Sequence, residues 1–296
     1  MTKPVRPRRS VLYMPGSNAR ALEKARTLAA DALILDLEDA VAPDAKDLAR
    51  RQVAETAGSG GYGRREIVIR CNGLDTPWGR DDIAAAAASG ADAVLLPKIE
   101  SAAQVREAEA LMVDAGAGED VAIWCMMETP LGILHAEEVA GASPRLAAFV
   151  MGTSDLTKDL RARHTAMRLP MMTSLGLCLL AARGHGLAVL DGVYLDLRNE
   201  DGFREACQQG LELGFDGKTL IHPSQLTPCN EIFGPSVAEV AEAEKIIAAF
   251  QEAEAEGRGV VLLDGRLVEN LHVVTAQETM ALAEAIGVLE ADGAGA

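Results

Sequence analysis

Three charged residues each follow a short apolar run, and together they suggest a reaction centre. Glu128 and Asp155 offer carboxylates from two separate segments, and Arg70 offers a guanidinium group. Proteins commonly hold Mg²⁺ with one or two carboxylates, together with water and substrate oxygens. An arginine can make a forked bond to a substrate carboxylate or lie beside a developing enolate oxygen. A metal and an arginine that both stabilise negative oxygen predict carbon–carbon chemistry through an enolate.

The elements that must position these groups are apolar strands, and Glu128 ends the clearest of them. The run 121–127 stops at this glutamate, and Pro130 then opens a helical pattern. Such a run before a proline at a helix start is typical of a buried parallel strand that leads into a helix. Parallel α/β proteins build their ligand sites at the carboxyl ends of these strands. Glu128 is therefore expected at a ligand site, with a rim salt bridge or a helix cap as the structural alternatives.

Eight apolar runs of this kind alternate with helical patterns up to about residue 235. The expected strands are 10–14, 32–35, 67–69, 93–96, 121–127, 146–152, 188–193 and 217–221. This count and alternation predict an α/β fold, a (β/α)8 TIM barrel over residues 1–235, in which all strand ends meet at one rim. A doubly wound open sheet is the alternative, but no GxGxxG motif follows the first strand.

The pattern after residue 235 is different. A capping box at Ser236 and Glu239 predicts a long charged helix. A short apolar segment follows, and Thr275 is expected to cap a final helix. We interpret residues 236–296 as a C-terminal extension that acts as a lid on the barrel or as an arm to a neighbouring subunit.

The composition excludes several classes of protein. The 296 residues include 44 acidic and 28 basic side chains, and the resulting net charge of −16 argues against nucleic-acid binding. No run approaches 18 apolar residues and no signal-peptide pattern is present, so no membrane association is expected. The five cysteines form no CxxC pair, which excludes a zinc ribbon and favours a reducing cytoplasm.

Six motifs, in order along the chain, resemble those of a known family. They are LILDLEDAVAP (33–43), IVIRCNGLDTPWGRDD (67–82), VLLPK (94–98), MMETPLG (126–132), VMGTSDL (150–156) and GKTLIHPSQL (217–226). On these motifs the chain resembles the citrate lyase β-subunit-like branch of the HpcH/HpaI aldolase superfamily. The (3S)-malyl-CoA thioesterases and the L-malyl-CoA/β-methylmalyl-CoA lyases are the most similar groups within that branch.

The resemblance implies roles for the residues at the strand ends. It implies a (β/α)8 barrel with Mg²⁺ held by Glu128 and Asp155, and with substrate contacted by Arg70. Glu38 and Asp39, at the end of the second strand, are expected to contact these groups without binding the metal or the substrate themselves.

The resemblance also implies roles for residues outside the strand ends. The segment LLDGRLVEN (262–270) matches the part of the family that carries a catalytic acid/base, which is Asp264 here. Arg266 replaces the usual lysine of that segment. The stretch PGSNARALEKA (15–25) matches the region that meets CoA, so Arg20 and Lys24 are expected phosphate contacts.

The preferred function from the sequence is that of a Mg²⁺-dependent CoA-ester lyase. It would cleave a 3-hydroxyacyl-CoA such as malyl-CoA to acetyl-CoA and glyoxylate, or form it from these two compounds. One alternative is a (3S)-malyl-CoA thioesterase that releases malate and CoA. Another is a citrate lyase β-type subunit that acts on a carrier-protein thioester. The resemblance further implies a homotrimer or homohexamer whose sites combine two chains, and it leaves malyl, methylmalyl and citramalyl substrates open.

Overall fold

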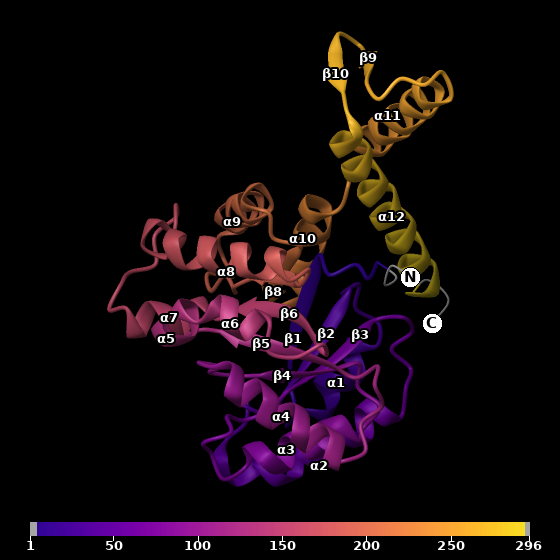
Figure 1. Ribbon diagram of the computed structural model, residues 1–296. Coiled ribbons are helices and arrows are strands. Elements are labelled where there is room, and N and C mark those ends of the chain that lie inside the picture. The colour runs from indigo at the N-terminus through magenta and orange to yellow at the C-terminus, as the bar shows by residue number, and fades with distance from the viewer. Residues whose placement is uncertain (1–4, 294–296) are drawn as a thin grey trace.

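Eight strands rich in Val, Ile, Leu and Ala are buried on both faces and close into a parallel barrel (Figure 1). This is a computed structural model, and it describes residues 5–293. The strands are β1 (Ser10–Pro15), β2 (Ala32–Asp36), β3 (Glu66–Arg70), β4 (Ala93–Leu96), β5 (Ala122–Met127), β6 (Leu146–Met151), β7 (Ala188–Asp191) and β8 (Gly217–Leu220). Each strand pairs with the next, and β1 pairs with β8. The predicted (β/α)8 barrel is confirmed, and the open-sheet alternative is excluded.

Alternate residues of each strand face two different apolar regions. One set fills the barrel interior, and the other packs under the surrounding helices. Because side chains alternate along a strand, the residue two positions after an inward-facing one also faces inward. Ile34 and Met126 belong to the interior cluster, so Asp36 and Glu128 continue the same inward rows at the carboxyl end. The strand pattern therefore places charged side chains at the carboxyl-terminal opening of the barrel, here called the mouth.

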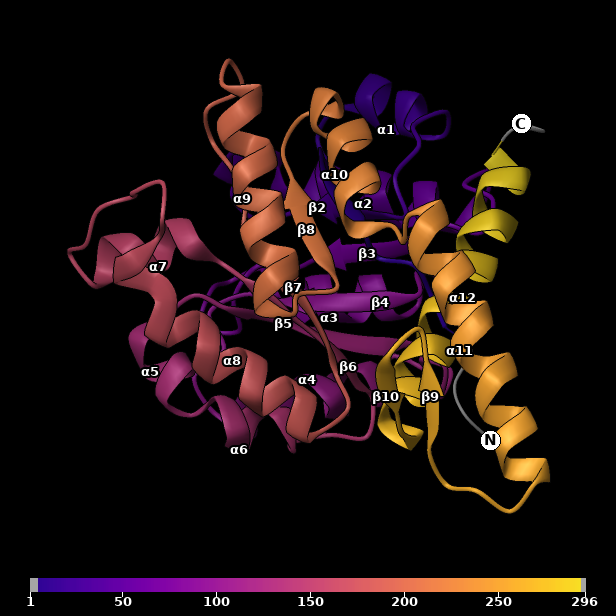
Figure 2. The same ribbon diagram turned by 90° about the horizontal axis from the view of Figure 1, so that it is seen from above.

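Helices cover the outside of the barrel (Figure 2). They are α1 (Ala19–Ala25), α2 (Lys46–Gly58), α3 (Gly79–Ala87), α4 (Ala102–Asp114), α5 (Pro130–Leu134), α6 (Ala136–Ala140), α7 (Thr153–Asp159), α8 (Met172–Gly184), α9 (Glu200–Leu213) and α10 (Leu226–Phe233). Short 3₁₀ turns precede three of them, at Pro43–Ala45, Leu169–Met171 and Pro223–Gln225. Within residues 5–293, no helix is both long and apolar enough to cross a membrane.

The C-terminal extension consists of two helices and a hairpin. Its elements are α11 (Val237–Ala255), β9 (Val261–Leu263), β10 (Arg266–Val268) and α12 (Asn270–Gly293). The capping box of Ser236 and Glu239 is confirmed. The expected cap at Thr275 is wrong, because α12 already begins at Asn270. Thr275 lies inside the helix, where its hydroxyl donates to the carbonyl of Leu271 at 3.2 Å.

The extension meets its own barrel near the end of α12. Glu290 pairs with Arg9 at 3.2 Å, and Asp292 pairs with Arg64 at 3.8 Å. Both arginines precede strands, so this contact lies at the amino end of the barrel, opposite the mouth. The hairpin is attached at the other end of α12, about 36 Å away at 1.5 Å per helical residue, and it projects from the barrel (Figure 1). The division into domains at residue 235 stays a prediction.

Candidate active site

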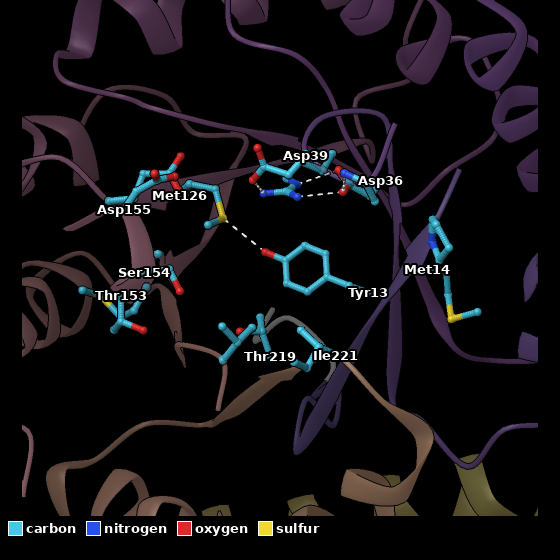
Figure 3. A pocket seen from close by; sticks show the side chains of 17 residues that line it. Tyr13, Met14, Asp36, Asp39, Met126, Thr153, Ser154, Asp155, Thr219 and Ile221 are labelled. Atoms are coloured by element: carbon cyan, nitrogen blue, oxygen red, sulfur yellow. Dashed lines mark hydrogen bonds and ion pairs between the residues drawn. The ribbon is translucent and has the colours of Figure 1, made fainter. Parts of the chain in front are cut away.

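A pocket of about 400 Å³ opens at the carboxyl ends of the strands (Figure 3). Its lining comes from β1, β2, β3, β5, β6 and β8 and from the loops that follow the strands. The charged residues among the lining are Asp36, Asp39, Arg70, Glu128 and Asp155. Ligand sites of parallel barrels occupy this end, because the loops after the strands surround it.

Arg70 is held in a network of carboxylates at the bottom of this pocket. Its Nε and Nη2 donate to the two oxygens of Asp36, each at 2.7 Å. Its Nη1 lies 2.9 Å from Glu38 Oε2 and 3.3 Å from Asp39 Oδ2. Tyr13 lies against the guanidinium, whose central carbon is 4.9 Å from the ring centroid. Asp36 thus occupies the forked edge of Arg70, and Glu38 and Asp39 lie against its Nη1. A substrate can meet only the N–H groups that these three carboxylates leave free.

Lys98 brings together the carboxylates from three strand ends. Its ammonium lies 2.9 Å from Glu38, 3.5 Å from Asp155 and 3.9 Å from Glu128. Its backbone N–H also donates to Glu128 Oε1 at 2.8 Å. The two carboxylates expected to bind metal therefore gather around a single cationic group.

The environment of Glu128 disfavours its negative charge. The side chain is 2% exposed, and burial together with the charge of Glu38 raises the pKa of Glu128 to about 7, against the opposing effect of Lys98. Burial also raises the pKa of Glu38. A divalent cation would compensate these buried carboxylates, and oxygen donors are the ligands that Mg²⁺ prefers. The donor set fits Mg²⁺ on these grounds.

Among residues 5–293, no cluster of three or more His, Cys, Asp or Glu side chains has an arrangement that could hold a metal ion. A metal here would therefore take two protein carboxylates, Glu128 and Asp155. Water and substrate oxygens would complete its coordination, as is common for Mg²⁺. Such a site keeps positions open for a substrate.

Local sequence after β6 explains how Asp155 approaches Glu128. Gly152 follows the strand, and a Cβ at this position would collide with the side chain of Glu128. The chain then enters α7 at Thr153, which places Asp155 in the first helical turn at the pocket wall (Figure 3). The glycine of the VMGTSDL motif is thus required by the close approach of two strand ends.

Three residues assigned by resemblance lie outside this pocket. Arg20 and Lys24 are exposed on α1, which follows the first strand. Asp264 is exposed at the turn between β9 and β10, with a φ of 47°. None of the three lines the pocket of its own chain, and their roles stay predictions.

Two residues that line the pocket, Tyr13 and Asp36, had no predicted role. Asp36 lies in the motif LILDLEDAVAP without a predicted role, although it is the main partner of Arg70. Tyr13 was assigned no role, although its hydroxyl points into the pocket, 3.4 Å from the sulfur of Met126 (Figure 3). Strand alternation contained the signal, because both residues lie two positions after an interior residue, Ile34 and Val11 respectively.

A second ionic cluster is buried beside the mouth. Asp191 ends β7 and is fully buried. It accepts from Arg168 at 2.6 Å and from Lys218 at 2.8 Å. Burial opposes ionisation, yet these two cations lower the pKa of Asp191. The three residues are mutually paired, and none of them lines the pocket, which is consistent with a structural role.

Comparisons with known proteins identify the family of the chain. Residues 9–223 match the family described as HpcH/HpaI aldolase/citrate lyase. A (3S)-malyl-CoA thioesterase from Cereibacter sphaeroides is 55% identical over 98% of this chain and 100% of its own length. An L-malyl-CoA/beta-methylmalyl-CoA lyase from the same species is 35% identical, with 96% of each chain covered.

A solved structure is similar over nearly the whole chain as well. It is the protein CitE from Mycobacterium tuberculosis in complex with magnesium, acetoacetate and coenzyme A. It is 30% identical with a TM-score of 0.73, and the match covers 93% of this chain and 97% of that one. Since the family match spans the barrel and these relatives align almost end to end, the chain belongs to the HpcH/HpaI aldolase/citrate lyase family.

Proposed function

We propose that this protein is a Mg²⁺-dependent enzyme that hydrolyses a malyl-CoA-type thioester to a free hydroxy acid and CoA. One observation carries the proposal. A pocket with two convergent carboxylates, Glu128 and Asp155, lies in a chain that is 55% identical to a (3S)-malyl-CoA thioesterase over 98% of its length. The sequence had favoured the lyase reaction. This similarity instead supports the alternative, hydrolysis.

The proposed site assigns separate tasks to the residues of the mouth. Glu128 and Asp155 would hold Mg²⁺, which when bound polarises substrate oxygens and stabilises negative charge on them. Arg70 is fixed by Asp36, and its positive charge would attract an anionic part of the substrate into the pocket. Tyr13 stays uncharged, because burial raises the pKa of its phenol. Its ring forms a wall of the pocket beside Arg70.

Hydrolysis also needs a group that accepts a proton from the attacking water. The buried carboxylates of the mouth are already paired with cations, since Asp36 accepts a hydrogen bond from Arg70 and Glu128 forms an ion pair with Lys98. Asp264, the acid/base implied by the resemblance, lies outside the pocket of its own chain. We therefore propose a homotrimer or homohexamer in which the hairpin of one subunit brings Asp264 to the mouth of another.

Carbon–carbon cleavage is the second candidate. The 35% identical relative is named an L-malyl-CoA/beta-methylmalyl-CoA lyase, and Arg70 with the metal carboxylates suits an enolate as well as a tetrahedral oxyanion. Cleavage of malyl-CoA would give glyoxylate and the acetyl-CoA enolate, and Asp264 would protonate the enolate carbon. A third possibility, a citrate lyase β-type subunit, would need a carrier-protein thioester.

Product analysis separates these reactions. The protein is incubated with malyl-CoA and Mg²⁺, and the products are identified by mass, with chelated protein as the control. Equal amounts of malate and CoA support the thioesterase, whereas glyoxylate and acetyl-CoA select the lyase. Turnover of a carrier-protein thioester, with none of free CoA esters, would contradict both and select the third possibility. Methylmalyl-CoA and citramalyl-CoA in the same assay define the acyl group.

A further inference from the structure

Lys98 has an unusual backbone conformation for its residue type. Its φ is 51°, in the left-handed region that side chains with a Cβ rarely adopt and that glycine occupies easily. The conformation accompanies the N–H bond to Glu128 Oε1 at 2.8 Å. A glycine could make the same bond with less strain, so the backbone alone does not explain a lysine here. Backbone strain that persists at a site is a reason to look for a function of the side chain.

The ammonium of Lys98 occupies the position between the proposed metal ligands. It lies within 4.0 Å of Glu128 and of Asp155, and it donates to Glu38 at 2.9 Å. The ammonium therefore contacts carboxylates from three strand ends at once.

The two cations of the mouth differ in their freedom to move. The Arg70 side chain is 8% exposed and is locked by both oxygens of Asp36. The Lys98 side chain is 43% exposed and carries its ammonium on a flexible four-carbon stem. Lys98 can leave Glu128 and Asp155 while it keeps its bond to Glu38, whereas Arg70 cannot move without breaking its fork.

We propose that Lys98 is a positioning residue that competes with Mg²⁺ for Glu128 and Asp155. Its ammonium holds the two carboxylates together, and it would withdraw from them when the metal binds, while it keeps its bond to Glu38. Lys98 thereby keeps the metal ligands in place and at the same time weakens the metal site. This inference rests on the Mg²⁺ site of the proposed function.

Titration calorimetry with Mg²⁺ alone, without substrate, tests the proposal. Lys98→Met and Lys98→Gly remove the ammonium. The glycine variant also relieves the left-handed backbone, so it is expected to fold even if the methionine variant does not. Both are expected to bind Mg²⁺ at least about tenfold more tightly, because a positive charge in contact with the ligands is lost. Lys98→Arg keeps the charge and should stay within about threefold of the wild type.

Lys158 provides a matched control. It is another lysine beside Asp155, at 4.0 Å, but its side chain is 77% exposed and contacts neither Glu38 nor Glu128. Lys158→Met should therefore leave the dissociation constant for Mg²⁺ nearly unchanged. A similar gain in Lys158→Met and in Lys98→Met would mean that general surface charge is responsible, and it would overturn the specific role of Lys98.

The outcomes also separate this inference from the metal site itself. If the wild type binds Mg²⁺ and Glu128→Gln does not, unchanged or weaker binding by Lys98→Gly overturns the competition alone. If the wild type binds no Mg²⁺, the metal site of the proposed function fails with it. A second measurement is the urea midpoint of unfolding of Lys98→Met. It should fall in chelator and recover with Mg²⁺, whereas a purely structural role predicts a loss that Mg²⁺ does not restore.

Discussion

The acidic residues of the barrel mouth and of the C-terminal hairpin differ in burial and in ion pairing. At the mouth, Glu128 is 2% exposed, and cations lie within 4.0 Å of it and of its neighbours. At the hairpin, Asp264 is exposed on a left-handed turn, and no ion pair to it occurs within residues 5–293. A buried charge must be compensated by an opposite charge or a bound metal ion. The exposed carboxylate of Asp264 needs no such compensation, and the proposed assembly would bring it to the mouth of another subunit.

The apolar residues differ in the same way. Leu33 and Leu35 in β2 are fully buried, whereas Leu262 and Leu267 in the hairpin are 70% and 56% exposed. Exposed apolar clusters mark surfaces that meet a partner. The mouth is thus organised within one chain, and the proposed contact of the hairpin with another subunit would cover these leucines. Four predictions test this contrast, beginning with the largest expected effect.

Removal of one metal ligand should abolish function without unfolding the barrel. Glu128→Gln keeps the shape of the side chain and an acceptor for the Lys98 N–H, but it loses the charge that is proposed to bind Mg²⁺. Turnover with Mg²⁺ is expected to fall on the order of a thousandfold, with an unchanged circular dichroism spectrum. Glu137→Gln, on a side chain that is 83% exposed, is the matched control. Near-normal activity of the Glu128 variant would remove this residue from the site.

Mixing two inactive variants tests whether the hairpin serves another subunit. Arg70→Ala and Asp264→Ala should each lose about a hundredfold or more of the rate. If the two residues come from different chains, reassembled mixtures contain sites with both intact, and up to about a quarter of the wild-type activity returns. Subunit exchange is verified by mass spectrometry of labelled chains. An inactive mixture despite exchange would show that Asp264 acts within its own chain or not at all.

The raised pKa of Glu128 predicts a pH dependence of stability in chelator. Its folded pKa of about 7 lies above the ordinary value of 4.5, so the folded state binds the proton more tightly. The stability from this protonation is complete below about pH 4.5 and is lost as the pH rises through 7. Glu128→Gln should therefore gain up to about 3 kcal/mol over the wild type at pH 8. Urea unfolding across this range measures the difference, and parallel curves would contradict the shift.

Leucine truncation compares the two regions directly, and the hairpin variant is expected to show the smallest change in stability of the series. Leu33→Ala should cost about 2–5 kcal/mol of unfolding free energy, because it leaves a cavity under the helices. Leu262→Ala should change the unfolding free energy of the chain by no more than about 0.5 kcal/mol. It should instead weaken assembly, measured by sedimentation velocity at several protein concentrations. A large stability loss in Leu262→Ala, with unchanged assembly, would show that the hairpin packs on its own chain.

The sequence determined the barrel and the residues of its mouth. Apolar runs that alternate with helical patterns require a parallel strand–helix fold, and strand alternation fixes which side chains face inward. Glu128, Asp155 and Arg70 could therefore be assigned to one rim from the order and spacing of residues alone. The start of α12 was missed because Thr275 can satisfy its hydroxyl inside a helix as well as at a cap.

Only the tertiary structure decided which of these groups touch. The register of β2 against β3 places Asp36 beside Arg70, and this pairing occupies the guanidinium fork. The left-handed turn at Lys98 brings one ammonium to carboxylates from three different strand ends. Such contacts depend on how separate strands are staggered around the barrel, whereas a sequence pattern specifies only the local period within each strand.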